Sequence, residues 1–94
     1  MAENGEIRKE IEKFLVEDGL DINATAFKYL VAAIENYRPG MTITKIVKPV
    51  EQEYGITLTT FKTMCGKLTK SSLSMPGETL KRYIGYAYSK IMLK

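Results

Sequence analysis

Apolar residues recur every three or four positions along most of this chain of 94 residues, which is the periodicity of a helix with one buried face. No stretch of useful length alternates apolar and polar residues as a half-buried strand does. Turn residues separate the periodic segments, and the last segment runs from Glu78 nearly to the end. The pattern predicts an all-α protein, a single compact domain of about five helices spanning residues 1–94.

Small and polar residues bound the first two expected helices. The first covers residues 6–17, with Asn4 or Gly5 as its N-cap. The second follows Asn23, a suitable N-cap, and stops at the Arg-Pro-Gly sequence of residues 38–40. A turn at residues 18–21 is expected between the two helices.

The third and fourth helices lie close together in the sequence. Thr42 is a suitable N-cap for the third helix, and Gly55 stands where a left-handed C-cap is expected. Pro49 inside this helix removes a backbone hydrogen bond, so we expect a kink or a split there. Residues 55–58 lead into the fourth helix, and two short helices joined by such a turn predict a helix-turn-helix over about residues 42–70.

The fourth helix has one apolar face and one face without acidic residues. Phe61, Met64 or Cys65, and Leu68 are expected in the core. The opposite face carries Thr59, Lys62, Thr63, Gly66, Lys67 and Lys70. A short, acid-free face with hydrogen-bonding side chains is what a recognition helix presents to the major groove of DNA. Glycine disfavours helix, and either close packing of another helix or the close approach of DNA explains Gly66.

Basic residues are concentrated in the C-terminal part of the chain. Residues 1–53 carry seven basic and ten acidic side chains, whereas residues 54–94 carry seven basic side chains and Glu78 alone. Lysine and arginine side chains that neutralise phosphates supply most of the non-specific affinity for nucleic acids. The asymmetry is typical of a polyanion-binding surface, and a lysine-rich face that serves solubility is the alternative.

The chain contains no histidine and one cysteine, Cys65. It therefore cannot build a Ser-His-Asp triad, a Cys-His pair or an ordinary zinc site, and we predict no enzymatic activity, metal site, cofactor or small-molecule substrate. Cys65 is expected in the core. The N-terminal pattern is not that of a signal peptide and no apolar run is long enough to span a bilayer, so we expect a cytoplasmic protein without a membrane partner.

Several residues between Gly19 and Thr57 form a pattern found in a known family. They are Gly19, Tyr29-Leu30, Ala33-Ile34, Ile43-Thr44-Lys45, Pro49 and Thr57. With them the chain resembles, over roughly residues 11–94, the C-terminal DNA-binding effector domain of the stage zero sporulation response regulator. The resemblance implies an all-helical domain that reads the major groove with the second helix of its helix-turn-helix and binds repeated DNA sites. That family has arginines where Thr63 and Gly66 stand, so its base specificity does not carry over.

Two functions remain open from the sequence. The first is a DNA-binding transcriptional regulator of the sporulation effector-domain type that reads double-stranded DNA with the helix 58–70, as a single copy or as a homodimer on DNA. Thr59, Lys62, Thr63 and Lys67 are expected to contact base edges or nearby phosphates. Lys45, Lys48 and Lys70 are expected to hold the DNA backbone. The alternative is a helical protein–protein interaction module that kept the fold but lost the DNA-reading surface, with contacts through Met75, Tyr86, Tyr88 and Met92.

Overall fold

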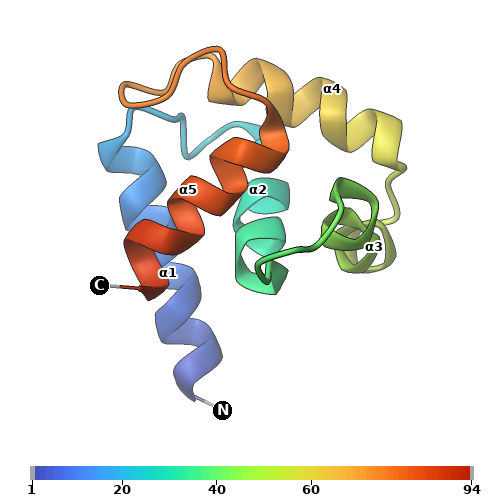
Figure 1. Ribbon diagram of the computed structural model, residues 1–94, viewed down its shortest axis with the longest axis horizontal. Coiled ribbons are helices and arrows are strands. Elements are labelled where there is room, and N and C mark those ends of the chain that lie inside the picture. The colour runs from blue at the N-terminus through green and yellow to red at the C-terminus, as the bar shows by residue number, and fades with distance from the viewer. Residues whose placement is uncertain (1, 94) are drawn as a thin grey trace.

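Five helices account for most of residues 2–93, the part of the chain that the computed structural model describes. They are α1 (Ala2–Glu17), α2 (Thr25–Asn36), α3 (Ile43–Tyr54), α4 (Leu58–Thr69) and α5 (Leu80–Met92), as Figure 1 shows. The described residues contain no strand, and they form one globule with extents of 31 × 30 × 28 Å. The predicted all-α, single-globule architecture is therefore confirmed.

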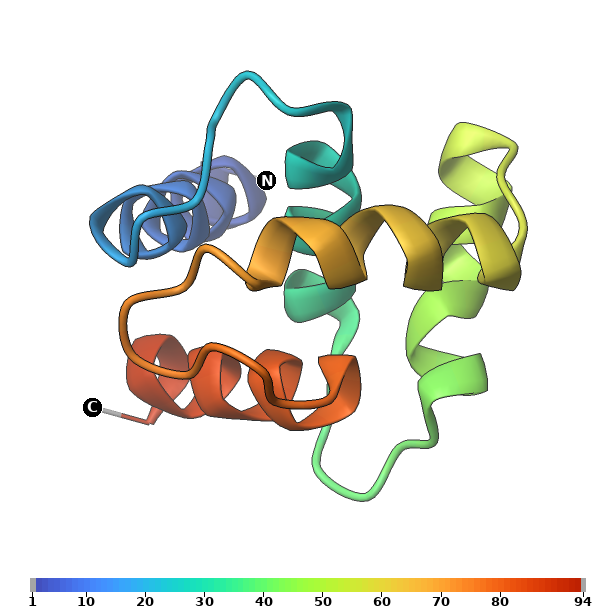
Figure 2. The same cartoon turned by 90° about the horizontal axis from the view of Figure 1, so that it is seen from above.

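The other four helices pack around α2, which lies at the centre of the domain (Figures 1 and 2). A helix contacted on nearly every side needs apolar residues on nearly every side, and eight of the 12 residues of α2 are buried. Two consecutive alanines, Ala32 and Ala33, are fully buried and leave room for the neighbouring helices. On the exposed side of α2, the ammonium of Lys28 lies over the rings of Tyr29 and Tyr54, at 5.8 and 5.4 Å from their centroids.

Gly19 closes the C-terminus of α1. Its φ of +94° is in the left-handed region, and its N–H donates to the Val16 carbonyl while the N–H of Leu20 donates to the Leu15 carbonyl, both at 3.0 Å. This pair of bonds is the Schellman motif, in which glycine avoids the steric strain of a positive φ. A Cβ at residue 19 would also lie 3.0 Å from the Ser71 carbonyl oxygen. The position therefore requires glycine for two independent reasons.

The predicted N-caps of α1 and α2 were wrong. Asn4 and Gly5 lie inside α1, which begins before them. The N-cap of α2 is Ala24, which provides no side-chain hydrogen bond. The preceding Asn23 instead donates its backbone N–H to Asp21 Oδ1 at 2.9 Å. The turn before α2 is therefore stabilised by an Asx-type bond within the turn, and not by a cap on the helix.

The predicted ends of α3 are confirmed. Thr42 Oγ1 accepts a hydrogen bond from the N–H of Lys45 at 3.3 Å. Gly55 adopts a left-handed conformation, with φ +66°, and its N–H donates to the Glu51 carbonyl at 2.8 Å. The helix is not split at Pro49, because it runs without interruption over its 12 residues. Burial of the apolar face of α3 offsets the hydrogen bond that proline cannot donate.

Asp18 ties the loop between α4 and α5 to the end of α1. Its carboxylate accepts hydrogen bonds from Ser72 Oγ at 2.5 Å, from the Oγ and N–H of Ser74 at 2.6 and 3.0 Å, and from the Tyr83 hydroxyl at 2.7 Å. Its backbone carbonyl accepts from the N–H of Leu73 at 2.8 Å. Burial raises the pKa of Asp18, but these hydrogen bonds outweigh burial and lower the pKa below its ordinary value. The network positions the segment that leads into α5.

Candidate nucleic-acid interface

α4 presents one face to the core and the other to solvent. Phe61, Cys65 and Leu68 are buried, as predicted. Thr57 is the N-cap of the helix, and its Oγ1 accepts a hydrogen bond from the N–H of Thr60 at 3.1 Å. In Figure 2 the helix crosses over α2 and reaches α3, so its packing fixes which face remains free.

The side chains of all seven predicted DNA-binding residues are exposed, and α4 contains no acidic residue. The seven are Thr59, Lys62, Thr63, Lys67 and Lys70 on α4 or at its end, and Lys45 and Lys48 on α3. Each of these lysines and threonines is therefore accessible to a binding partner.

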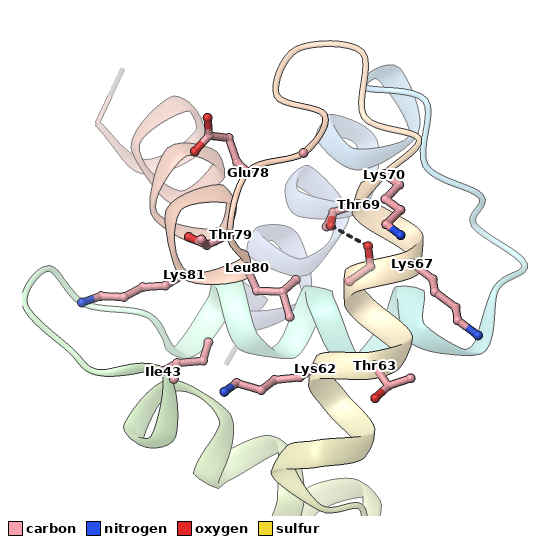
Figure 3. A pocket seen from close by; sticks show the side chains of 12 residues that line it. Ile43, Lys62, Thr63, Lys67, Thr69, Lys70, Glu78, Thr79, Leu80 and Lys81 are labelled. Carbon is pink, nitrogen blue, oxygen red and sulfur yellow. Dashed lines mark hydrogen bonds between the residues drawn. The ribbon is translucent and has the colours of Figure 1, made fainter.

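An open groove of about 620 Å³ separates α4 from the start of α5, and we call it the α4–α5 groove (Figure 3). Its lining consists of Ile43, Lys62, Thr63, Gly66, Lys67, Thr69, Lys70, Gly77, Glu78, Thr79, Leu80 and Lys81. The groove thus brings together four of the seven predicted residues. The other three, Thr59, Lys45 and Lys48, lie outside its lining.

The start of α5 forms the second wall of the groove, which sequence reasoning missed. Figure 3 shows Leu80 facing Lys62 across the groove, whereas the side chain of Lys81 extends from α5 away from α4. The helix begins two residues later than expected, because Thr79 is its N-cap and accepts a hydrogen bond from the N–H of Arg82 at 3.3 Å. No local pattern places this segment beside α4. The signal that could have drawn attention to it is the Lys81-Arg82 pair within the basic C-terminal part.

Positive charge dominates the α4–α5 groove. The ammonium groups come from both walls, with Lys62, Lys67 and Lys70 on α4 or at its end and Lys81 on α5. Among the residues that line the groove, Glu78 alone is acidic, and its Oε1 lies 3.7 Å from Arg82 Nε. That exposed ion pair offsets part of the carboxylate charge. The groove is therefore a suitable site for an anion.

No neighbouring group in the described structure requires glycine at residue 66. An added Cβ would meet no atom within 4 Å, which excludes close packing of another helix as the reason for this glycine. Its φ is not among the positive values of the described glycines. Gly66 is thus an ordinary helical position in open space, on the wall of the groove.

Cys65 is a core residue, as predicted. Its side chain is 0% exposed, and its Sγ lies 3.7 Å from the Ala26 carbonyl oxygen. Burial raises the pKa of the Cys65 thiol to about 12. The thiol is therefore protonated at neutral pH, and it packs between α4 and α2.

The residues considered for a protein–protein contact are half-buried. Met75, Tyr88 and Met92 pack against the hydrophobic core. The ring of Tyr86 lies 6.0 Å from that of Phe14, centroid to centroid. These side chains contribute to the packing of α5 and of the loop before it, which reduces the surface they offer to a partner.

Comparison of the chain with protein-family models, curated proteins and solved structures finds no match. Within residues 2–93, no group of three or more His, Cys, Asp or Glu side chains lies close enough to hold a metal ion. None of the helices in that range combines the length and the apolar character needed to cross a membrane. The functional interpretation therefore rests on the α4–α5 groove and its residues.

Proposed function

We propose that this domain binds double-stranded DNA and regulates transcription, with α4 lying in the major groove. The observation that carries the proposal is the exposed, acid-free face of α4, where Lys62, Thr63 and Lys67 line one positively charged groove. A helix with its side chains is about 10–12 Å wide, and the major groove of B-DNA is about 12 Å wide. The dimensions and the charge of α4 therefore suit this binding mode.

The residue types of this surface support distinct roles toward DNA. The hydroxyls of Thr59 and Thr63 can donate to or accept from base edges, and the Lys67 ammonium can donate to O6 and N7 of guanine. Lysine is also a compact charge on a flexible stem, which suits phosphate contacts. We assign phosphate contacts to Lys62, Lys70, Lys45 and Lys48.

The resemblance to the sporulation effector domain supports regulation of transcription in the cytoplasm and binding of copies, including a homodimer, to repeated sites. Thr63 and Gly66 replace two arginines of that family and cannot form a bidentate fork with guanine. We therefore expect a larger share of the affinity to come from phosphate contacts, with a correspondingly strong salt dependence.

Fluorescence anisotropy tests this proposal on the full chain, with random duplex DNA and a pool of sites of the family type at 50 and 200 mM salt. We expect binding that weakens as salt rises, with preference for some of the sites. Lys67→Ala should weaken binding and reduce the salt slope by about one unit. Lys9→Ala is the control, because Lys9 is an exposed lysine of α1 and does not line the groove.

The titration tests the role of Lys67 and, separately, the proposed function. Equal effects of Lys67→Ala and Lys9→Ala would remove Lys67 from the interface. Absence of binding to any duplex at 50 mM salt would refute the proposal and favour the protein–protein interaction module.

A further inference from the structure

Gly66 lies between two lysines on the wall of the α4–α5 groove. Helix positions four residues apart lie nearly one above another, so Lys62, Gly66 and Lys70 form one row along α4 and its end. Each lysine is displaced from the glycine by four residues, or about 6 Å along the helix axis. The middle position of this row has no side chain, and a lysine stands on either side of it.

No contact among the described residues explains a glycine at this position. An alanine Cβ at residue 66 would have open space, and alanine is a much better helix former than glycine. The other glycine inside a helix of the C-terminal half, Gly85, differs in this respect. Its Cβ would lie 3.2 Å from Tyr37 Oη, so a close neighbour within the domain favours glycine at residue 85. Packing among the described residues therefore gives no reason for a glycine at residue 66.

We propose that Gly66 is the point where one strand of bound DNA comes closest to the backbone of α4. This inference rests on the proposed function. The strand lies in the α4–α5 groove, with phosphates bound by Lys62 and Lys70 from one wall and by Lys81 from the other. The missing side chain lets the sugar-phosphate chain pass against the helix between the two lysines.

The chemistry of the groove matches a sugar-phosphate strand. Such a strand alternates anionic phosphates with apolar deoxyribose rings, and the groove combines lysines with two half-buried apolar side chains, Ile43 and Leu80. Lysine binds phosphate as a point charge, whereas close reading of a base favours the fork of arginine. A strand of the duplex therefore fits the part of the groove around Lys62, Gly66 and Lys70, beside the base contacts assigned to Thr63 and Lys67.

The test compares Gly66→Ala with wild type in two measurements on the full chain. The melting temperature should rise by a few degrees, since alanine favours helix and has room for its methyl group. The affinity for duplex DNA should fall about tenfold, because the methyl group occupies space that the strand needs. A gain in stability together with a loss of binding cannot arise from damage to the fold.

Two further variants sharpen the test. Lys81→Ala should leave the melting temperature nearly unchanged and reduce the salt slope of DNA binding by about one unit. Gly85→Ala is the matched control, because its methyl group meets Tyr37 inside the domain and not the DNA. It should leave the affinity and the salt slope at the wild-type values.

The outcomes distinguish this inference from the proposed function. If wild type binds DNA and Gly66→Ala binds equally well, the inference is wrong while DNA binding stands. If wild type binds no duplex at low salt, the proposed function fails and the inference falls with it. If a labelled polyglutamate peptide binds more tightly than duplex DNA at the same salt, and Gly66→Ala weakens that binding, the groove holds an acidic peptide and the inference is wrong.

Discussion

Replacing Asp18 with alanine should destabilise the domain by about 2–6 kcal/mol. The carboxylate is 7% exposed, and it accepts hydrogen bonds from the hydroxyls of Ser72 and Tyr83, which are 4% and 0% exposed. Each buried hydroxyl left without an acceptor costs about 1–3 kcal/mol. Ser74 is exposed and can bond to water instead. The loss is a large share of the roughly 5–15 kcal/mol that stabilises a domain.

The sign of the pH dependence follows from the lowered pKa of Asp18. Hydrogen bonds hold the pKa in the folded state below the value of about 3.9 that an unfolded chain has. The stabilisation is therefore present above pH about 4, and it is lost as the pH falls through the folded-state pKa. Asp18→Asn keeps the shape of the side chain and removes the charge. The difference in unfolding free energy between wild type and Asp18→Asn should shrink from pH 7 to pH 3.

Urea denaturation followed by far-UV circular dichroism measures both effects, because the midpoint and slope give the unfolding free energy at each pH. Asp21→Asn is the control, since the carboxylate of Asp21 is exposed and accepts its bond from the backbone of Asn23. We expect Asp21→Asn to change the stability by less than about 1 kcal/mol. A midpoint for Asp18→Ala equal to that of wild type would refute the argument that the buried hydroxyls depend on this carboxylate.

Two further predictions concern single positions. Gly55→Ala should destabilise the domain by about 1–2 kcal/mol in the same denaturation assay, because the φ of residue 55 is +66°. A Cβ there would meet no atom within 4 Å, so the cost comes from the backbone conformation and not from a clash. An unchanged urea midpoint would contradict this prediction. Cys65 should react with a thiol reagent only as the domain unfolds, since its side chain is 0% exposed and its pKa is raised to about 12. Rapid labelling of native protein at pH 8 would show that the thiol is accessible.

The helices and several of their ends could be predicted because they depend on near neighbours in the sequence. The spacing of apolar residues decides which side of a helix can be buried, and Phe61, Cys65 and Leu68 are buried accordingly. Thr42 and Gly55 act on backbone groups three or four residues away, so their roles as caps were visible locally. Asn23 is not the cap because α2 begins one residue later, after Ala24, and the backbone N–H of Asn23 bonds to the Asp21 carboxylate within the turn.

The exposure of the predicted DNA-binding residues also followed from the sequence, whereas their grouping did not. Lys62 and Lys81 are far apart in the chain, and they line one groove because α4 and α5 both pack on α2 while Asp18 anchors the loop between them. That arrangement depends on contacts between distant residues, which no local pattern encodes. For Gly66 the sequence left two explanations open. Only the tertiary structure excluded a packed helix there, since the space around a Cβ depends on where every other element lies.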